Sequence, residues 1–156
     1  MTGRGVPEMV WVEDKGATFD APIDVVWKYI FGGGDHDAAH HTTRAGKMKL
    51  AFKEPTILWY TAERKYGTTW KKETMRISFF PPVASVQELL DGPLKGSKWT
   101  YVYTPHGRRT RVDAYGEFRS RSLPTKKLKR WAFELLANEF REDAPGVRAM
   151  GRAQRP

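Results

Sequence analysis

Three of the four histidines lie within one stretch, GGGDHDAAHH, at residues 32–41. In a helix, His36 and His40 would stand one turn apart on one face. Two imidazoles at this spacing are good zinc ligands, and H-D-A-A-H differs by one methylene from the H-E-x-x-H motif of zinc peptidases. Asp37 would then take the place of the glutamate that serves as base for the metal-bound water.

The surroundings of this stretch argue against zinc. A catalytic zinc site needs a third protein ligand, and the remaining histidine, His106, falls in a predicted hairpin turn. The peptidase motif lies within a long helix, whereas glycines precede His36. We therefore expect no metal and no cofactor, and a short polar helix at residues 35–41.

The rest of the chain supplies the elements that must position any site. Asp20-Ala-Pro-Ile begins a helix in which Ile23, Val26, Trp27 and Ile30 share one apolar face, and the triple glycine ends it. Period-two patterns separated by short glycine and proline turns predict antiparallel strands. These strands are expected at residues 9–19, 46–53, 56–66, 68–80, 84–90, 98–104 and 110–119.

The spacing of apolar residues becomes helical again after Leu123-Pro124-Thr125. In KKLKRWAFELLANEFRED one broad stripe is apolar and is interrupted only by Glu139. Pro145-Gly146 is expected to end this helix. We therefore predict an N-terminal tail at 1–8, one domain at 9–144 and a disordered, arginine-rich tail at 145–156.

Composition narrows the class of protein. With 156 residues, 40% hydrophobic and 13% aromatic, the chain suits one globular domain. It has no cysteine, which excludes disulfides and thiol nucleophiles. No apolar run is long enough for a membrane span, and the N-terminus lacks a signal-type apolar region. We expect a soluble, cytoplasmic protein.

The formal charge of +9 is unevenly distributed. The segment Arg108–Arg130 holds nine basic residues and only two acids, Asp113 and Glu117. Such a patch would make weak contact with anionic lipid, nucleic acid or protein, or would only keep the protein soluble. The strand acids Glu63, Glu73, Asp113 and Glu117 each have basic neighbours and are expected in ion pairs on a solvated face.

The element order and three stretches resemble the START-like (SRPBCC) superfamily of polyketide cyclases, lipid-transfer domains and pollen-allergen-like proteins. The stretches are ATFDAPIDVVWKYI, KWTYVYTPHGRRTRV and RWAFELLANEF. The resemblance implies an α+β helix-grip fold, in which a curved antiparallel sheet of six or seven strands wraps a long C-terminal helix, with two short helices after the first strand. It also implies a cavity for a hydrophobic ligand, and it fixes no catalytic residues.

Within that fold the second short helix would lie beside the cavity entrance, where His40 or His41 could contact a ligand or transfer a proton. Strand aromatics could form an apolar wall with hydroxyl groups, or could pair on the outer face of the sheet. The sequence leaves open which face points inward. The candidate ligand-binding residues are His40, His41, Trp59, Trp70, Trp99, Tyr101, Tyr103, Tyr115 and Trp131.

Three functions remain. The first is binding of a small hydrophobic or amphipathic molecule, lipid-like or aromatic, between the sheet and the last helix. The second is a cyclase or aromatase that uses the same cavity with one proton-transfer group. The third is an electrostatic docking module. Catalytic residues, ligand identity and oligomeric state are not determined by the sequence.

Overall fold

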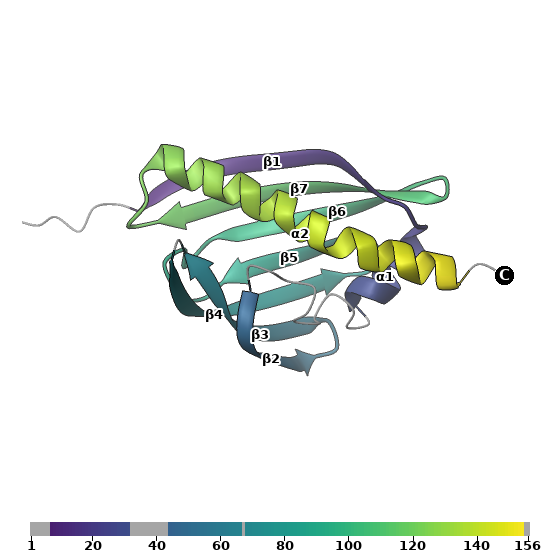
Figure 1. Cartoon of the computed structure of the whole chain (residues 1–156), viewed down its shortest axis with the longest axis horizontal. Coiled ribbons are helices and arrows are strands. Elements are labelled where there is room, and N and C mark those ends of the chain that lie inside the picture. The colour runs from purple at the N-terminus through teal and green to yellow at the C-terminus, as the bar shows by residue number, and fades with distance from the viewer. Residues whose placement is uncertain (1–6, 32–43, 67, 155–156) are drawn as a thin grey trace, which may run out of the picture.

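The computed structural model describes residues 7–66 and 68–154 apart from residues 32–43. It contains one antiparallel sheet of seven strands in the order β1-β7-β6-β5-β4-β3-β2, with two helices (Figure 1). The elements are β1 (Glu8–Phe19), α1 (Ile23–Phe31), β2 (Arg44–Glu54), β3 (Ile57–Tyr66), β4 (Thr69–Phe80), β5 (Ala84–Leu89), β6 (Lys98–His106), β7 (Arg109–Ser120) and α2 (Thr125–Ala153).

The predicted helix-grip architecture is confirmed. Every expected strand forms within three residues of its expected bounds, and sequential strands pair as hairpins, apart from β1, which pairs with β7. The first short helix is α1. The second short helix, expected at residues 35–41, lies outside the described residues.

Alternation along the strands sets an inner and an outer face. In β6, Trp99, Tyr101 and Tyr103 are buried on the inner face, while the side chains between them are partly exposed. Their partners across the sheet continue the pattern: Gly116 lies opposite Trp99, and a Cβ at Gly116 would overlap the Phe118 ring. The absent side chain leaves room for the Trp99 and Phe118 rings to stack, with centroids 5.4 Å apart.

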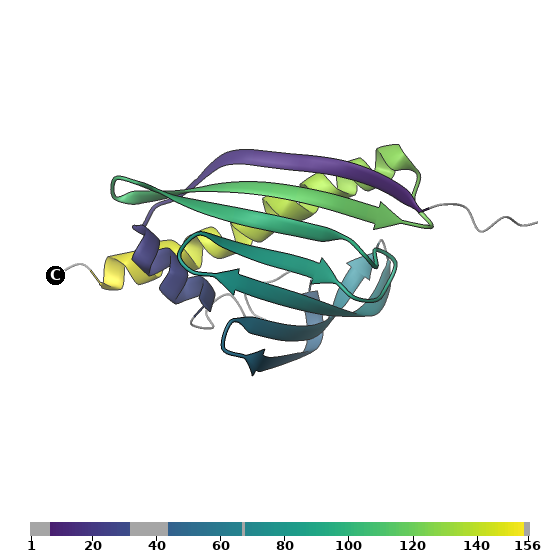
Figure 2. The same cartoon turned by 180° about the vertical axis from the view of Figure 1, so that it is seen from behind.

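The two helices cover the inner face unequally. Figures 1 and 2 show α2 running along the β1–β7 part of the sheet, with α1 near its C-terminal end, and α2 contacts both strands and α1. The apolar stripe predicted for α2 faces the sheet through Leu128, Ala132, Leu135 and Leu136, all buried. On α1, the Trp27 indole donates to the Pro82 carbonyl at 2.6 Å and so ties the helix to the β4–β5 turn.

The expectation that α2 ends at Pro145-Gly146 is wrong. The helix continues to Ala153, so residues 145–153 belong to the domain and are not a disordered tail. Pro145 has no N–H and removes one helical hydrogen bond. Burial of Val147 and the close approach of Gly151 to Ala21 on the α1 side offset that loss.

This correction is testable with two neighbouring residues. We expect Val147→Ala to lower the free energy of unfolding by about 1–3 kcal/mol, because its side chain is fully buried. Arg148→Ala is the matched control, since Arg148 is exposed, and should change stability by less than about 0.5 kcal/mol. Urea denaturation measures both. Equal, small effects would mean that this part of the chain does not pack.

Candidate functional site

A group of polar side chains is buried where β5 and β6 face α2. Ser85 and Gln87 come from β5, Tyr101 and Tyr103 from β6, and Glu139 and Asp143 from α2. Strand alternation aims the four strand residues inward, and the i, i+4 spacing places both carboxyl groups on one face of α2. We call these six residues the inner polar cluster. All six are buried in an interface that is otherwise largely apolar.

One hydrogen bond in the inner polar cluster joins the sheet to the helix. The Tyr101 hydroxyl donates to Glu139 Oε2 at 2.5 Å. Burial and the nearby Glu139 carboxyl raise the pKa of Tyr101 well above its usual value, so the phenol stays protonated and remains a donor. A buried carboxyl group thus has the donor that its burial requires.

The β5 side of the cluster presents acceptors. Gln87 Nε2 donates to Ser85 Oγ at 3.2 Å, and Ser85 Oγ lies 3.3 Å from the Tyr103 hydroxyl. Among the described residues, the Gln87 Oε1 atom has no hydrogen-bond partner, although the side chain is only 8% exposed. An unmatched buried acceptor costs stability unless a ligand or water supplies a donor.

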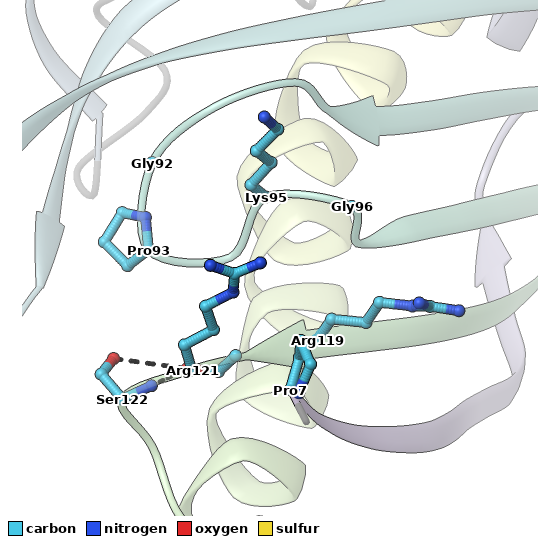
Figure 3. Close-up of a pocket in the computed structure, with 9 residues that line it drawn as sticks. Pro7, Gly92, Pro93, Lys95, Gly96, Arg119, Arg121 and Ser122 are labelled. Atoms are coloured by element: carbon cyan, nitrogen blue, oxygen red, sulfur yellow. Dashed lines mark hydrogen bonds between the residues drawn. The ribbon is translucent and has the colours of Figure 1, made fainter. Parts of the chain in front are cut away.

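Two small cavities adjoin the cluster, with volumes of about 30 and 20 Å³. Both are lined by Tyr101, Tyr103, Glu139 and Asp143. Each has room for roughly one or two water molecules, or for one polar group of a ligand. A separate pocket of about 570 Å³ opens at the surface beside Pro93 and Arg121 (Figure 3).

The structure brings some of the predicted ligand-binding residues toward this site. Tyr101 and Tyr103 line both cavities. Trp99 is fully buried on the same face, and Trp131 on α2 meets Phe118 edge-on with ring centroids 6.4 Å apart. Trp131 therefore extends the apolar wall toward the amino end of α2, and Trp99 lies opposite Gln87 of the polar cluster.

Three other predicted residues lie on the outer face and are not part of the candidate site. Trp59 and Trp70 alternate with the buried side chains of β3 and β4, and Trp70 is 42% exposed. Tyr115 lies opposite Glu13 and under the Lys15 ammonium, which is 5.3 Å from the ring centroid. This is the cross-strand pairing that the sequence left open as an alternative. His40 and His41 lie outside the described residues.

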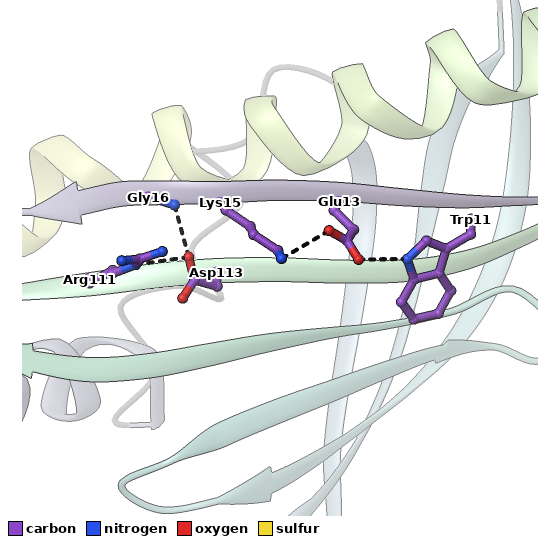
Figure 4. A network of polar contacts seen from close by, with 6 residues as sticks. All are labelled: Trp11, Glu13, Lys15, Gly16, Arg111 and Asp113. Carbon is purple, nitrogen blue, oxygen red and sulfur yellow. Dashed lines mark hydrogen bonds and ion pairs between the residues drawn. The ribbon is translucent and has the colours of Figure 1, made fainter.

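The outer face near Tyr115 carries a chain of polar contacts (Figure 4). Trp11 Nε1 and the Lys15 ammonium both contact the Glu13 carboxylate, and these two contacts lower the pKa of Glu13. Asp113 accepts from the Gly16 N–H and from Arg111, which is the ion pair expected for a strand acid with basic neighbours, although Asp113 is buried and not solvated. Glu73 differs from that expectation, because it is buried on the inner face.

Sequence reasoning did not select four members of the inner polar cluster: Ser85, Gln87, Glu139 and Asp143. Glu139 carried a signal, since it is the one charged residue inside the apolar stripe of α2. Asp143 follows at i+4, but the expected helix end at Pro145 placed it in the last turn, where a solvated acid is ordinary. The inward direction of Ser85 and Gln87 depends on the register of β5, which pairs Gln87 with Trp99.

The structure also bears on metals and membranes. Within the described ranges, no group of three or more histidine, aspartate or glutamate side chains is arranged to hold a metal ion. His36 and His40 lie outside those ranges. No helix in the described part of the chain is long and apolar enough to cross a membrane.

No protein-family model matches the sequence, and no curated protein sequence matches it. Solved structures do match. The Zhui aromatase/cyclase from Streptomyces sp. R1128 has a TM-score of 0.70 at 15% identity, covering 95% of each chain. Norcoclaurine synthase from Thalictrum flavum, in complex with dopamine and hydroxybenzaldehyde, has a TM-score of 0.70 at 13% identity, covering 94% of each chain.

A third match is the di-domain aromatase/cyclase StfQ from the steffimycin biosynthetic pathway, with a TM-score of 0.73 at 12% identity over 94% of this chain. The chain spans about half of StfQ, 52% of its length. The protein therefore shares the helix-grip fold of these structures. At these identities the similarity concerns the fold, and the function must be argued from the site.

The raised pKa of Tyr101 predicts a change in alkaline stability. Above about pH 10 the unfolded chain releases this proton while the folded protein keeps it, so stability falls as pH rises. This group alone lowers the free energy of unfolding by about 1 kcal/mol between pH 10 and 11. Tyr101→Phe should remove that contribution, giving a shallower decline in urea denaturation between pH 10 and 11.

Tyr115→Phe is the matched control, because it removes one phenol from the outer face and should keep the wild-type slope. An unchanged slope in Tyr101→Phe would contradict the Tyr101–Glu139 contact.

Proposed function

We propose that the protein binds a small amphipathic molecule, largely aromatic or lipid-like, between the inner face of the sheet and α2. The observation that carries this proposal is the inner polar cluster, a set of buried polar groups inside an apolar interface. Ligand pockets commonly combine apolar walls with a few polar groups that fix orientation. The matched structures, which include an aromatase/cyclase and norcoclaurine synthase with aromatic ligands, support a small-molecule site on this fold.

The cluster also suggests which ligand chemistry it recognises. Glu139, Asp143 and Gln87 present carboxyl and amide oxygens, so the side of the cluster facing the cavities is rich in acceptors. A ligand that supplies a hydroxyl donor would satisfy the Gln87 Oε1 atom, whereas a ligand with only acceptors would not. The hydroxyl would occupy the space of about 30 Å³. The apolar part of the ligand would extend along inward side chains such as Ile77 and Phe79, in place of the side chains that now pack against them.

The apolar walls of the site would bind the ligand by burying its apolar surface. Removing apolar surface from water contributes about 25 cal/mol per Å², which supplies affinity without direction. Hydrogen bonds in the cluster supply the direction. Trp99, Tyr101, Tyr103 and Trp131 are the aromatic residues that we assign to this role, and His40 and His41 stay proposed contacts at the entrance.

Two aromatic probes that differ by one hydroxyl test this proposal. We expect 2-naphthol to bind the wild-type protein more tightly than naphthalene, as measured by displacement of the neutral dye N-phenyl-1-naphthylamine. In Glu139→Gln the ratio of the two dissociation constants should fall by about tenfold, because the amide has one acceptor oxygen where the carboxyl group has two, and Tyr101 already donates to this side chain. Native mass spectrometry of the purified protein would then identify a co-purifying ligand.

Tyr115→Phe should keep the wild-type ratio, since Tyr115 faces away from the site. If neither probe binds, or if the ratio is the same in Glu139→Gln, the proposed site is wrong. Circular dichroism of each variant verifies that a loss of binding does not reflect unfolding.

A second candidate function is cyclase-type catalysis, which the Tyr101–Glu139 pair favours. A carboxylate can remove a proton from the carbon beside a ligand carbonyl, while a phenol donates a hydrogen bond to the developing enolate oxygen. The enolate carbon could then attack a second carbonyl group of the same ligand molecule. Glu139 would hold the proton, and Tyr101 would turn its hydroxyl from Glu139 to the ligand.

Proton exchange separates the two functions. Under the cyclase hypothesis, the wild-type protein should speed deuterium uptake from D2O at the methyl group of acetophenone, followed by NMR. Glu139→Gln should abolish the effect, because the amide is not a base at neutral pH. Equal rates for the wild type, Glu139→Gln and buffer alone, alongside normal binding of 2-naphthol, would leave binding as the function.

A further inference from the structure

A second site lies far from the inner polar cluster, at the end of the sheet where β7 leads into α2. A pocket of about 570 Å³ opens there between the β5–β6 loop and the β7–α2 turn (Figure 3). Its polar lining is Lys95, Arg119 and Arg121 with the serines at 120 and 122, and no acidic side chain of the described residues lines it. This volume lies within the range of small-molecule pockets.

The cations of this pocket are incompletely neutralised. Arg119 pairs with Glu117 at 2.9 Å. Within the described part of the chain, neither Lys95 nor Arg121 has an ion-pair or hydrogen-bond partner for its charged group. Figure 3 shows Arg121 reaching from the β7–α2 turn toward the loop that carries Pro93, while Lys95 projects from that loop. A guanidinium group that lines a pocket is suited to bidentate contact with phosphate oxygens.

The adjoining helix end adds to the positive potential. α2 begins at Thr125 with no acidic residue in its first turn and no side-chain cap from Pro124. Helix amino ends carry partial positive charge and usually attract acidic side chains. Here the first turn instead holds Lys126 and Lys127. The Glu8 carboxylate accepts from the Thr125 hydroxyl at 2.6 Å and offsets part of this positive charge, while the two lysines add to it.

The pocket walls are fixed by hydrogen bonds. Buried Ser97 accepts from the Arg119 N–H at 2.9 Å and joins the β5–β6 loop to β7. Ser120, also buried, accepts from the N–H groups of Ser122 and Leu123 at 3.2 and 3.0 Å and shapes the turn. Gly92 and Gly96 have backbone φ angles of +83° and +89°, which residues with a side chain rarely adopt. A preorganised wall lowers the entropy cost of binding.

The basic segment expected at Arg108–Arg130 does not form one patch. β7 separates its two ends, so Arg109 and Arg119 lie about 33 Å apart along the strand. At the far end, Arg109 and Arg111 pair with Asp20 and Asp113 at 3.7 and 3.0 Å. Around the pocket, by contrast, Lys95 and Arg121 have no ion-pair partner among the described residues.

From these observations we propose that the pocket at the amino end of α2 binds a small phosphate-bearing molecule, with Arg121 as the principal contact and Lys95 and Arg119 in support. The shape of the pocket favours a compact ligand over a partner with an extended, flat surface. This site is independent of the proposed ligand site beside Glu139, and either proposal can fail without the other.

Isothermal titration calorimetry of the full chain with inorganic pyrophosphate in 50 mM NaCl tests the proposal. We expect binding in the millimolar range or tighter that Arg121→Ala weakens by about tenfold and Lys95→Ala/Arg121→Ala abolishes. Arg108→Ala is the matched control, because it removes an exposed arginine at the opposite end of β7. It should change the affinity by less than about twofold.

A phosphate monoester, phenyl phosphate, distinguishes the two sources of the anion. Binding of both probes with loss in Arg121→Ala supports a phosphorylated organic ligand, and binding of pyrophosphate alone supports a free inorganic anion. Equal weakening by Arg108→Ala and Arg121→Ala would overturn the proposal, because it would show nonspecific charge attraction. So would the absence of binding by either probe, or Arg121-dependent binding to vesicles containing phosphatidylserine without binding of pyrophosphate.

Discussion

A carboxyl group buried between a sheet and a helix must find a hydrogen-bond donor, and in this protein Glu139 finds it in Tyr101. This contact joins one turn of α2 to β6. The apolar contacts of Leu128 and Leu136 would tolerate small sliding, because dispersion and burial have little directionality. A single hydrogen bond at 2.5 Å does not.

The same contact belongs to a group of buried polar side chains that supports the proposed ligand site. An interface built for stability alone would be apolar, since polar groups in a core contribute little net free energy even when paired. Here six polar side chains gather at one place, and the Gln87 Oε1 atom has no partner among the described residues. Such an arrangement costs stability and makes sense if a ligand completes it. The cavities beside it are small, so α2 and the sheet hold the cluster in a defined geometry before a ligand arrives.

The two proposed sites would therefore differ in their physics. The inner site would recognise donors in an environment that burial has made poor in water, so each hydrogen bond there would discriminate strongly. The pocket at the amino end of α2 is open to solvent and would bind its proposed ligand through charge, which acts over longer distances and weakens with salt. The first depends on the packing of α2, and the second on two turns that Ser97 and Ser120 hold in place.

The sequence by itself determined the element order, the antiparallel pairing and the amphipathic stripe of α2, because alternation and helical periodicity are local properties. It also placed Trp99, Tyr101 and Tyr103 on a common face. It did not decide that this face points inward, or that Trp59, Trp70 and Tyr115 point outward, because either face of an aromatic-rich sheet can be the buried one.

Only the tertiary structure decided two further points. Pro145 predicts a helix end from local propensity, and the packing of Val147 near α1 overrides it. The inner polar cluster joins residues up to 58 positions apart, from Ser85 to Asp143, and no local pattern reports such a contact. Burial makes that cluster chemically distinctive, and burial is a property of the folded chain.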